Sequence, residues 1–363
     1  MTNSVYIHIP FCNNICTYCN FSKFLYNEKM VYDYLNALER EILDRYEGEV
    51  VKTLYIGGGT PSSLTIDELQ KLFQIIKIFN LDKDLEFTVE VNPESITYEK
   101  LILMKENKVN RISMGVESTI NKNLNYLGRN HNFDLVKEKI NLIKEVGIKN
   151  INVDLIYALK NQDLQDLEID INNILSLDVP HISTYSLIIE KNTILSIKKE
   201  KNIDEEIDFS MYELIQEKLK ENGYNHYEVS NFSKASYESR HNLVYWNNDH
   251  YYGFGLSSAS YIDDTRMNNT LSLNKYLKGE YLDFKEELTK KDILSYALIL
   301  GLRKIKGINK EEFYKKYNVD ILNLYNIKEL IEKGLLVDNG ENIYVSYDKI
   351  YIENSILENF VGD

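Results

Sequence analysis

VYIHIPFCNNICTYC, residues 5–19, is the stretch of sequence that decides the fold. Residues 5–9 favour an extended strand because they are mostly β-branched or aromatic, and Cys12, Cys16 and Cys19 follow directly. These three are all the cysteines of the chain, an odd number within a short segment. Disulfide scaffolds instead use an even number of dispersed cysteines in an oxidising compartment. The three thiols are therefore predicted to be ligands of one centre in a reducing cytoplasm.

The number of available ligands distinguishes a structural zinc ion from an iron–sulfur cluster. A structural zinc ion needs four closed ligands, and the chain has no fourth cysteine. His8 could complete a Cys3His set, but in an extended strand it lies about 12 Å upstream of Cys12, at about 3.3 Å per residue. A cubane 4Fe-4S cluster with one iron open to a small molecule accounts for the missing ligand. The cluster is the favoured interpretation, and structural zinc is the alternative.

Short β-rich runs alternate with amphipathic helices through the first two-thirds of the chain. Helical spacing recurs between these runs, for example at Leu69, Leu72 and Phe73. Six βα units in series predict an α/β fold with a parallel sheet, either doubly wound or curled into a partial (β/α)6 barrel. Periodicity alone does not choose between the two. Strands that are nearly continuous in apolar or β-branched residues, as in sheets buried on both faces, are predicted at residues 5–9, 53–56, 85–91, 111–115, 150–156 and 182–188.

The pattern changes near residue 230. Residues 231–285 are rich in Asn, Ser, Tyr and Gly with weak periodicity, which indicates a long functional connection. Beyond residue 288, three predicted helices precede two short strands joined around Asn339-Gly340, a strong hairpin dipeptide. This order is the outline of a winged-helix-like α+β module. We therefore expect three units: the barrel at 1–230, a connecting segment at 231–287 and the C-terminal module at 288–363.

Charge and hydropathy exclude several classes of function. The 42 Lys+Arg against 56 Asp+Glu give a net charge of −14, so non-specific binding to nucleic acid or anionic lipid is not expected. Residues 286–363 carry 11 Lys+Arg and 14 Asp+Glu, a net −3, which favours a packing or docking module over a DNA-binding one. No apolar run approaches the roughly 18 residues of a membrane span, and the start lacks the features of an export signal. A cytoplasmic location is expected.

Two further motifs follow or lie in predicted strands. Gly57-Gly58-Gly59-Thr60-Pro61 comes after the strand at 53–56. Its glycines let the backbone approach a ligand closely, and their N–H groups can hold a carboxylate or phosphate. Asp154 lies in the apolar run 150–156, where a charge is costly unless paired, so it is predicted to be a site residue or part of a structural ion pair. The ligand-binding groups of a barrel gather at the carboxyl ends of its strands.

The Cys-x-x-x-Cys-x-x-Cys motif, with Tyr18 before its last cysteine, resembles the signature of the radical S-adenosylmethionine (SAM) superfamily. The resemblance implies a partial (β/α)6 barrel and a 4Fe-4S cluster whose open iron chelates SAM and transfers an electron that cleaves it to a radical. It implies that the cluster is held by Cys12, Cys16 and Cys19, and that SAM is bound by Tyr6, Tyr18, Gly58, Gly59, Thr60, Glu90, Glu117, Arg129 and Asp154. Two positions depart from the family. Glu117 stands where Gln is usual and can accept but not donate, and Ala158-Leu159-Lys160 replaces the usual Gly-Leu-Pro, which puts the shape of that loop in question.

Residues 5–12 are similar to the oxygen-independent coproporphyrinogen III oxidases and to the related HemW family of heme chaperones. The oxidases have a fourth cysteine two positions after the third, where this chain has Phe21, and an extension before the first strand. His241-Asn-Leu-Val-Tyr-Trp246 matches a chaperone motif tied to heme, since a His can ligate iron while Tyr and Trp offer flat apolar area. The resemblance therefore predicts a heme chaperone. A radical SAM oxidase acting on a porphyrinogen is the runner-up, and radical-based heme degradation or methyl transfer comes third.

The resemblance also sets the predicted partners, which are heme and acceptor hemoproteins but not nucleic acid. It leaves open whether the chain forms a homodimer, contacts a membrane through its acceptors, or has enzymatic activity in porphyrin metabolism, and no catalytic residue is assigned. His241 is the first candidate for the heme ligand and His250 a weaker one, with Met267 or Tyr261 as further alternatives. A structural histidine beside an aromatic cluster is the competing interpretation of His241.

Overall fold

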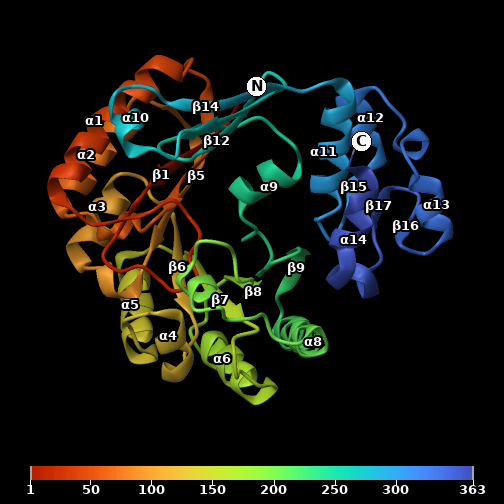
Figure 1. Cartoon of the computed structure of the whole chain (residues 1–363), viewed down its shortest axis with the longest axis horizontal. Coiled ribbons are helices and arrows are strands. Elements are labelled where there is room, and N and C mark those ends of the chain that lie inside the picture. Colours follow the sequence, from red (N-terminus) through yellow and green to blue (C-terminus); the bar gives the residue numbers. More distant parts are fainter. Residues whose placement is uncertain (1, 362–363) are drawn as a thin grey trace.

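A central sheet of nine strands organises the molecule, whose computed structural model describes residues 2–361 (Figure 1). The strand order is β11-β1-β4-β5-β6-β7-β8-β10-β9. From β1 to β8, neighbouring strands of the sheet are parallel and follow one another in the chain. In a doubly wound sheet the order of the strands would instead reverse at a point within the sheet. The predicted α/β fold is confirmed as a partial barrel of six βα units. Its strands are β1 (Ser4–Ile9), β4 (Val50–Gly58), β5 (Asn80–Val91), β6 (Arg111–Glu117), β7 (Asn150–Tyr157) and β8 (His181–Ser186).

Helices cover the outer face of this sheet (Figure 1). α2 begins with a capping box between Thr65 and Glu68, a device that stabilises a helix by about 1 kcal/mol, and buries Leu69, Leu72 and Phe73 as their spacing predicts. α5 ends at Gly147, whose φ of +88° lies in the left-handed region that glycine adopts without strain. The helices between residues 28 and 221 are α1 (Glu28–Arg45), α2 (Ile66–Ile76), α3 (Tyr98–Glu106), α4 (Asn121–Leu127), α5 (Phe133–Val146), α6 (Leu164–Ser176), α7 (Ile194–Ile197) and α8 (Glu205–Glu221).

Residues 231–287 are more ordered than the sequence indicates. β10 (Asn231–Ser233) and β9 (Asn225–Glu228) extend the sheet beyond β8 in the antiparallel sense, and β11 (Tyr252–Phe254) adds a parallel strand beside β1. The two end strands, β11 and β9, do not pair, so the barrel stays open. The weak periodicity of this segment reflects strands that are short and partly exposed, not an absence of regular structure. The other elements of this segment are α9 (Arg240–Trp246), β12 (Ala259–Ile262), β13 (Thr265–Asn269), α10 (Leu273–Leu277) and β14 (Leu282–Glu287).

The C-terminal module has the predicted winged-helix outline. A three-stranded antiparallel sheet, ordered β15-β17-β16, packs with the helices, and Gly340 turns the hairpin with a φ of +94°. The two-residue strand β15 escaped the sequence analysis because it is too short to leave a pattern. α9 lies between the barrel strands and this module (Figure 1). The elements are α11 (Lys290–Gly301), β15 (Ile308–Asn309), α12 (Lys310–Tyr317), α13 (Ile327–Glu332), β16 (Leu336–Asp338), β17 (Asn342–Val345) and α14 (Glu353–Leu357).

The division into units at residues 230 and 287 stays a prediction. Within residues 2–361, no helix has both the length and the apolar character that crossing a membrane requires.

Candidate functional site

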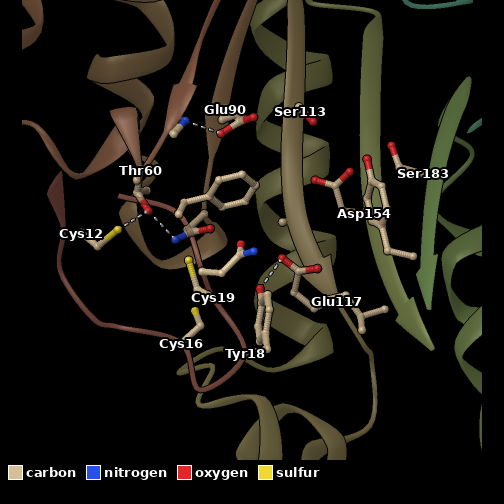
Figure 2. A pocket seen from close by; sticks show the side chains of 18 of the residues that line it. Cys12, Cys16, Tyr18, Cys19, Thr60, Glu90, Ser113, Glu117, Asp154 and Ser183 are labelled. Carbon is tan, nitrogen blue, oxygen red and sulfur yellow. Dashed lines mark hydrogen bonds between the residues drawn. The ribbon is translucent and has the colours of Figure 1, made fainter. Parts of the chain in front are cut away.

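A short parallel pair of strands holds the cysteine loop at the carboxyl edge of the sheet. β2 (Phe11–Cys12) pairs with β3 (Phe24–Leu25), so the intervening loop leaves and returns beside the end of β1. The N–H of Thr17 donates to the carbonyl of Leu127 at 3.0 Å and ties the loop to the end of α4. All three cysteines are free thiols that line one cavity, and Figure 2 shows their sulfurs on the same side of it.

Two hydrogen-bond donors are aimed at the cysteine sulfurs. The Thr60 hydroxyl lies 3.5 Å from Sγ of Cys12, and Nη1 of Arg129 lies 3.5 Å from Sγ of Cys16. Burial raises the pKa of the Cys12 thiol to about 11, so this thiol holds its proton at neutral pH until a cation binds. An iron ion would displace that proton, and the two donors would stabilise the resulting thiolates.

His8 is not free to act as a fourth ligand. Its Nε2 lies 2.8 Å from the carbonyl oxygen of Ser22, and its Nδ1 lies 3.1 Å from the hydroxyl of Tyr6. Among residues 2–361, no three His, Cys, Asp or Glu side chains are grouped as a single metal ion requires. A tetrahedral zinc ion, with ligand atoms about 2.0–2.3 Å away, therefore does not suit this arrangement. The three thiols fit a cluster with one position left open.

The glycine loop packs closely against its neighbours, which explains its composition. A Cβ at Gly57 would lie 2.7 Å from the Glu90 carboxylate, and one at Gly59 would lie 2.8 Å from the carbonyl oxygen of Ile9. The backbone amides are already engaged, because Gly58 donates to Oε2 of Glu90 at 3.0 Å and Gly59 donates to the Ile9 carbonyl at 2.8 Å. The Gly58 N–H thus holds a carboxylate, which is the side chain of Glu90, and binding of a ligand anion by this loop stays a prediction. The role of the glycines is to allow close approach of the backbone.

Three carboxylates, of the buried Glu117 and the half-buried Glu90 and Asp154, line the same cavity as the cysteines (Figure 2). Glu90 accepts from the Tyr55 hydroxyl at 2.8 Å, Glu117 accepts from the Tyr18 hydroxyl at 3.0 Å, and Nδ2 of Asn152 donates to Asp154 at 2.8 Å. Burial raises the pKa of Glu90 to about 7 and also raises the pKa values of Glu117 and Asp154. Raised carboxylate pKa values mean that ionising these groups is unfavourable without a cation. This cavity is thus suited to a positively charged ligand.

The two positions that depart from the family pattern, Glu117 and Ala158, both have a positive φ. Glu117 has a φ of +64° at a bulge that ends β6, and the turn aims its carboxylate at Tyr18. Ala158 has a φ of +61°, in the region that glycine adopts most easily. The loop after β7 therefore makes the left-handed turn without glycine, at a cost of about 1 kcal/mol or more for a non-glycine residue.

The cavity has a volume of about 370 Å³, within the range of about 300–1,000 Å³ typical of small-molecule sites. Of the predicted SAM-binding residues, only Tyr6 lies outside its lining. Polar residues that the sequence analysis missed also line it, and Arg111 is notable because a buried Arg at the start of an apolar strand could have been recognised. The predicted residues brought together here are Cys12, Cys16, Tyr18, Cys19, Gly58, Gly59, Thr60, Glu90, Glu117, Arg129 and Asp154, and the missed ones include Tyr55, Asn92, Arg111, Ser113, Asn152, Ser183 and Tyr185.

His241 lies apart from this cavity, in the first turn of α9, and is 1% exposed. Its Nδ1 lies 2.8 Å from the hydroxyl of Thr53 on β4, and its Nε2 lies 2.8 Å from the hydroxyl of Tyr245. Burial lowers the pKa of its imidazole to about 3, so the ring stays neutral. In this conformation both nitrogens are occupied, and heme ligation by His241 stays a prediction that requires these bonds to break.

The donor set and the charges fit the groups that the superfamily resemblance implies. Three thiols with one open position suit a 4Fe-4S cluster, and the three carboxylates suit SAM, which carries a sulfonium and an ammonium group. Nε of Arg129, only 6% exposed as a residue, has no partner among the described atoms. Such an orphaned donor in a cavity wall is typical of a site that a polar ligand completes.

Comparison with known families and structures defines the class. The model of the Radical SAM superfamily matches residues 6–174, and the model of the HemN C-terminal domain matches residues 288–347. The coproporphyrinogen III oxidase HemN of Escherichia coli has a TM-score of 0.87 at 22% identity, covering 98% of this chain and 89% of that one, which shows a shared fold. With the three-cysteine cavity, these matches define a radical SAM protein.

Relatives with known names narrow the class further. The heme chaperone HemW of Bacillus subtilis (strain 168) is 38% identical over 99% of both chains. The heme chaperone HemW of Lactococcus lactis subsp. lactis is 37% identical over 99% of this chain and 98% of the relative. The chain belongs to the HemW family of radical SAM proteins.

Proposed function

We propose that this protein is a heme chaperone that carries a 4Fe-4S cluster, binds SAM and passes heme to acceptor hemoproteins. The observation that carries the cluster and SAM assignment is one cavity lined by three free thiols and by three carboxylates that are buried or half-buried. The heme assignment is supported by the full-length similarity to heme chaperones. Reducing, cytoplasmic surroundings stay a prediction that follows from the free thiols.

The roles of the cavity residues follow from their contacts. Cys12, Cys16 and Cys19 would hold three irons, and a cluster held in this way supplies electrons to a molecule bound at its open iron. Thr60 and Arg129 donate toward two of the sulfurs and so stabilise their negative charge. These donors keep the thiolates in place when SAM exchanges.

The carboxylates would hold SAM in one orientation. Glu90, fixed by Tyr55 and by the Gly58 amide, and Asp154, fixed by Asn152, accept hydrogen bonds and attract positive charge. Glu117 accepts from Tyr18 with one oxygen, which leaves the other oxygen for a ribose hydroxyl. Tyr6 acts indirectly, because its hydroxyl orients His8 behind the glycine loop.

One residue distinguishes the chaperone from the porphyrinogen oxidase. Phe21 lines the cavity and is 64% exposed at the position where the oxidases have a fourth cysteine. The chain therefore presents an apolar ring, and no thiol, to anything that enters beside the cluster loop.

The test uses anaerobically reconstituted full-length protein in two parallel assays. In the first, hemin is loaded and an apo-hemoprotein is added, and transfer is followed by the absorbance of the reconstituted acceptor. In the second, coproporphyrinogen III, SAM and a reductant are supplied, and the porphyrin products are quantified. Heme transfer without multiple-turnover decarboxylation supports the proposal. Protoporphyrinogen formed over many turnovers would refute it and favour the oxidase.

A further inference from the structure

Arg111 is a buried arginine in the cavity that the three cysteines line. It is the first residue of β6, it lines the cavity, and it is only 2% exposed. Its guanidinium makes no hydrogen bond and no ion pair within residues 2–361, and its Nε is a buried atom without a partner. A buried charge in this state is costly, because the water that it gives up is not replaced by protein groups. Packing alone does not explain an arginine at this position.

The neighbouring strands offer partners that Arg111 does not use. Thr88 of β5 and Asn150 of β7 are its register partners, and each has a buried side-chain oxygen without a hydrogen bond. An arginine that served only to link the strands would donate to such oxygens, as most buried polar groups do. The side chain lines the cavity instead, where its charge acts on the other groups of the lining.

All three carboxylates of the cavity lie on the cysteine side of Arg111. In the register of the sheet, Glu90 and Asp154 are two and four positions farther along than Arg111, and Glu117 is six positions farther along β6 itself. At about 3.3 Å per residue, their backbones lie about 7, 13 and 20 Å along the strand direction from that of Arg111. A ligand bound beside the cysteines would therefore meet the carboxylates before the guanidinium.

The positive charges of the cavity are divided between its two ends. Nη1 of Arg129 lies 3.5 Å from Sγ of Cys16, so this arginine serves the cysteine end. Glu90 and Asp154 form no ion pair within residues 2–361. Burial raises the pKa of both carboxyls, and the charge of Arg111 opposes this rise from a distance.

The remaining groups around Glu90 are either protonated tyrosines or carboxyls. Burial raises the pKa values of the four tyrosines well above their usual value, so they stay neutral near pH 7. Burial also raises the pKa values of the other two carboxyls, whose negative charge disfavours ionisation of Glu90. The titratable and charged groups that face Glu90 are Tyr6 of β1, Tyr55 of β4, Arg111 and Glu117 of β6, Asp154 of β7, Tyr185 of β8 and Tyr245 of α9.

We propose that Arg111 is a positioning residue of the SAM site, a counter-charge that keeps Glu90 ionised before the cationic ligand binds. This inference rests on the proposed SAM binding and names the residue that sets its pH range. A direct ion pair would occupy the carboxylate oxygens that the ligand needs. Because the guanidinium acts without a hydrogen bond, it favours the charged form of Glu90 and leaves those oxygens accessible. Its burial makes this possible, since water screens a charge inside a protein much less than one at the surface.

The test measures SAM affinity by calorimetry between pH 6 and 8.5 on reconstituted full-length protein, with iron content checked for each variant. Arg111→Met removes the charge, so the pH at which affinity falls should rise by about one unit. Affinity should then drop about fivefold at pH 7 and less than about twofold at pH 8.5. Arg111→Lys keeps a charge and should have a profile close to that of the wild type. Arg45→Met, the same substitution at an ion pair of α1 outside the cavity, should not move the profile.

A second comparison separates the charge of Arg111 from a role in folding. In a Glu90→Gln background, Arg111→Met should shift the remaining profile by less than about half as much, because the carboxyl through which Arg111 acts is gone. Equal shifts in the two backgrounds, or no shift in either, would overturn the inference. If Arg111→Met does not fold, Arg111→Gln provides the neutral comparison.

The outcomes also separate this inference from the proposed function. Wild-type protein that binds no SAM at any pH would refute the SAM assignment itself. SAM binding by the wild type with an unshifted Arg111→Met profile would refute only the role of Arg111.

Discussion

Lowering the pH from 8 to 6 should weaken SAM binding by about tenfold through Glu90 alone. Burial raises the pKa of this carboxyl to about 7, so the group is about 90% ionised at pH 8 and about 10% ionised at pH 6. A cationic ligand binds to the ionised form, so the apparent dissociation constant rises as pH falls through 7. Glu117, whose pKa burial also raises, would steepen the profile further.

Calorimetric titration of reconstituted protein with SAM at several pH values measures this dependence, with iron content checked at each pH. S-adenosylhomocysteine is the ligand control, because it has the same amino and carboxylate groups but no sulfonium, so its profile should be flatter. Glu90→Gln should flatten the SAM profile. Glu353→Gln removes a carboxyl whose pKa is also about 7 but which lies in the C-terminal module, so it should leave the profile unchanged. Affinity for SAM that is independent of pH, or tighter at pH 6, would refute the electrostatic reasoning.

Three further outcomes are expected. Replacing any one of the three loop cysteines by alanine should reduce bound iron to well below about four per chain, and full iron retention in the triple variant would contradict the cluster assignment. Gly58→Ala should lower the free energy of unfolding by about 1–3 kcal/mol more than Gly48→Ala, because both have a positive φ but only Gly58 would place its Cβ against the His8 ring. Equal losses in urea unfolding would show that packing there is not tight. His241→Ala should cost about 1–3 kcal/mol of stability by leaving the Thr53 and Tyr245 hydroxyls without their partner, and an unchanged melting temperature would argue against the structural role.

The sequence predicted the parts of the fold that local pattern encodes. The six barrel strands are buried on both faces, so their apolar runs stand out, and the spacing of the three cysteines is by itself enough to indicate one centre. Arg111 shows a limit of this approach, because its strand was predicted while its side chain was overlooked. The argument applied to Asp154, that a charge in an apolar strand is costly unless paired, would also have singled out Arg111.

The remaining features depend on contacts between distant parts of the chain. His241 hydrogen-bonds Thr53, which lies 188 positions earlier, so no local pattern could show that its imidazole is occupied. The Gly58 amide donates to the carboxylate of Glu90 and the Gly59 amide donates to the carbonyl of Ile9, and both partners come from other strands, so the local sequence could not identify them. The short strand β11 left no periodicity, although its pairing with β1 orders much of the segment at 231–287.

The pairing of β1 with β11 has a consequence for how the chain is made. β1 leads directly into the cysteine loop, yet its outer edge stays bare until residues 252–254 have left the ribosome, after more than two-thirds of the chain has been synthesised. A bare parallel edge strand invites pairing with other chains, and contacts of such long sequence separation form late in folding. The three cysteines of the nascent protein are therefore synthesised before β11 can pair with the outer edge of β1. Newly made chains are most exposed to aggregation, and to oxidation of the three thiols, in this interval, and a stop codon shortly before residue 252 should yield an insoluble product even though every predicted ligand of the cluster is present.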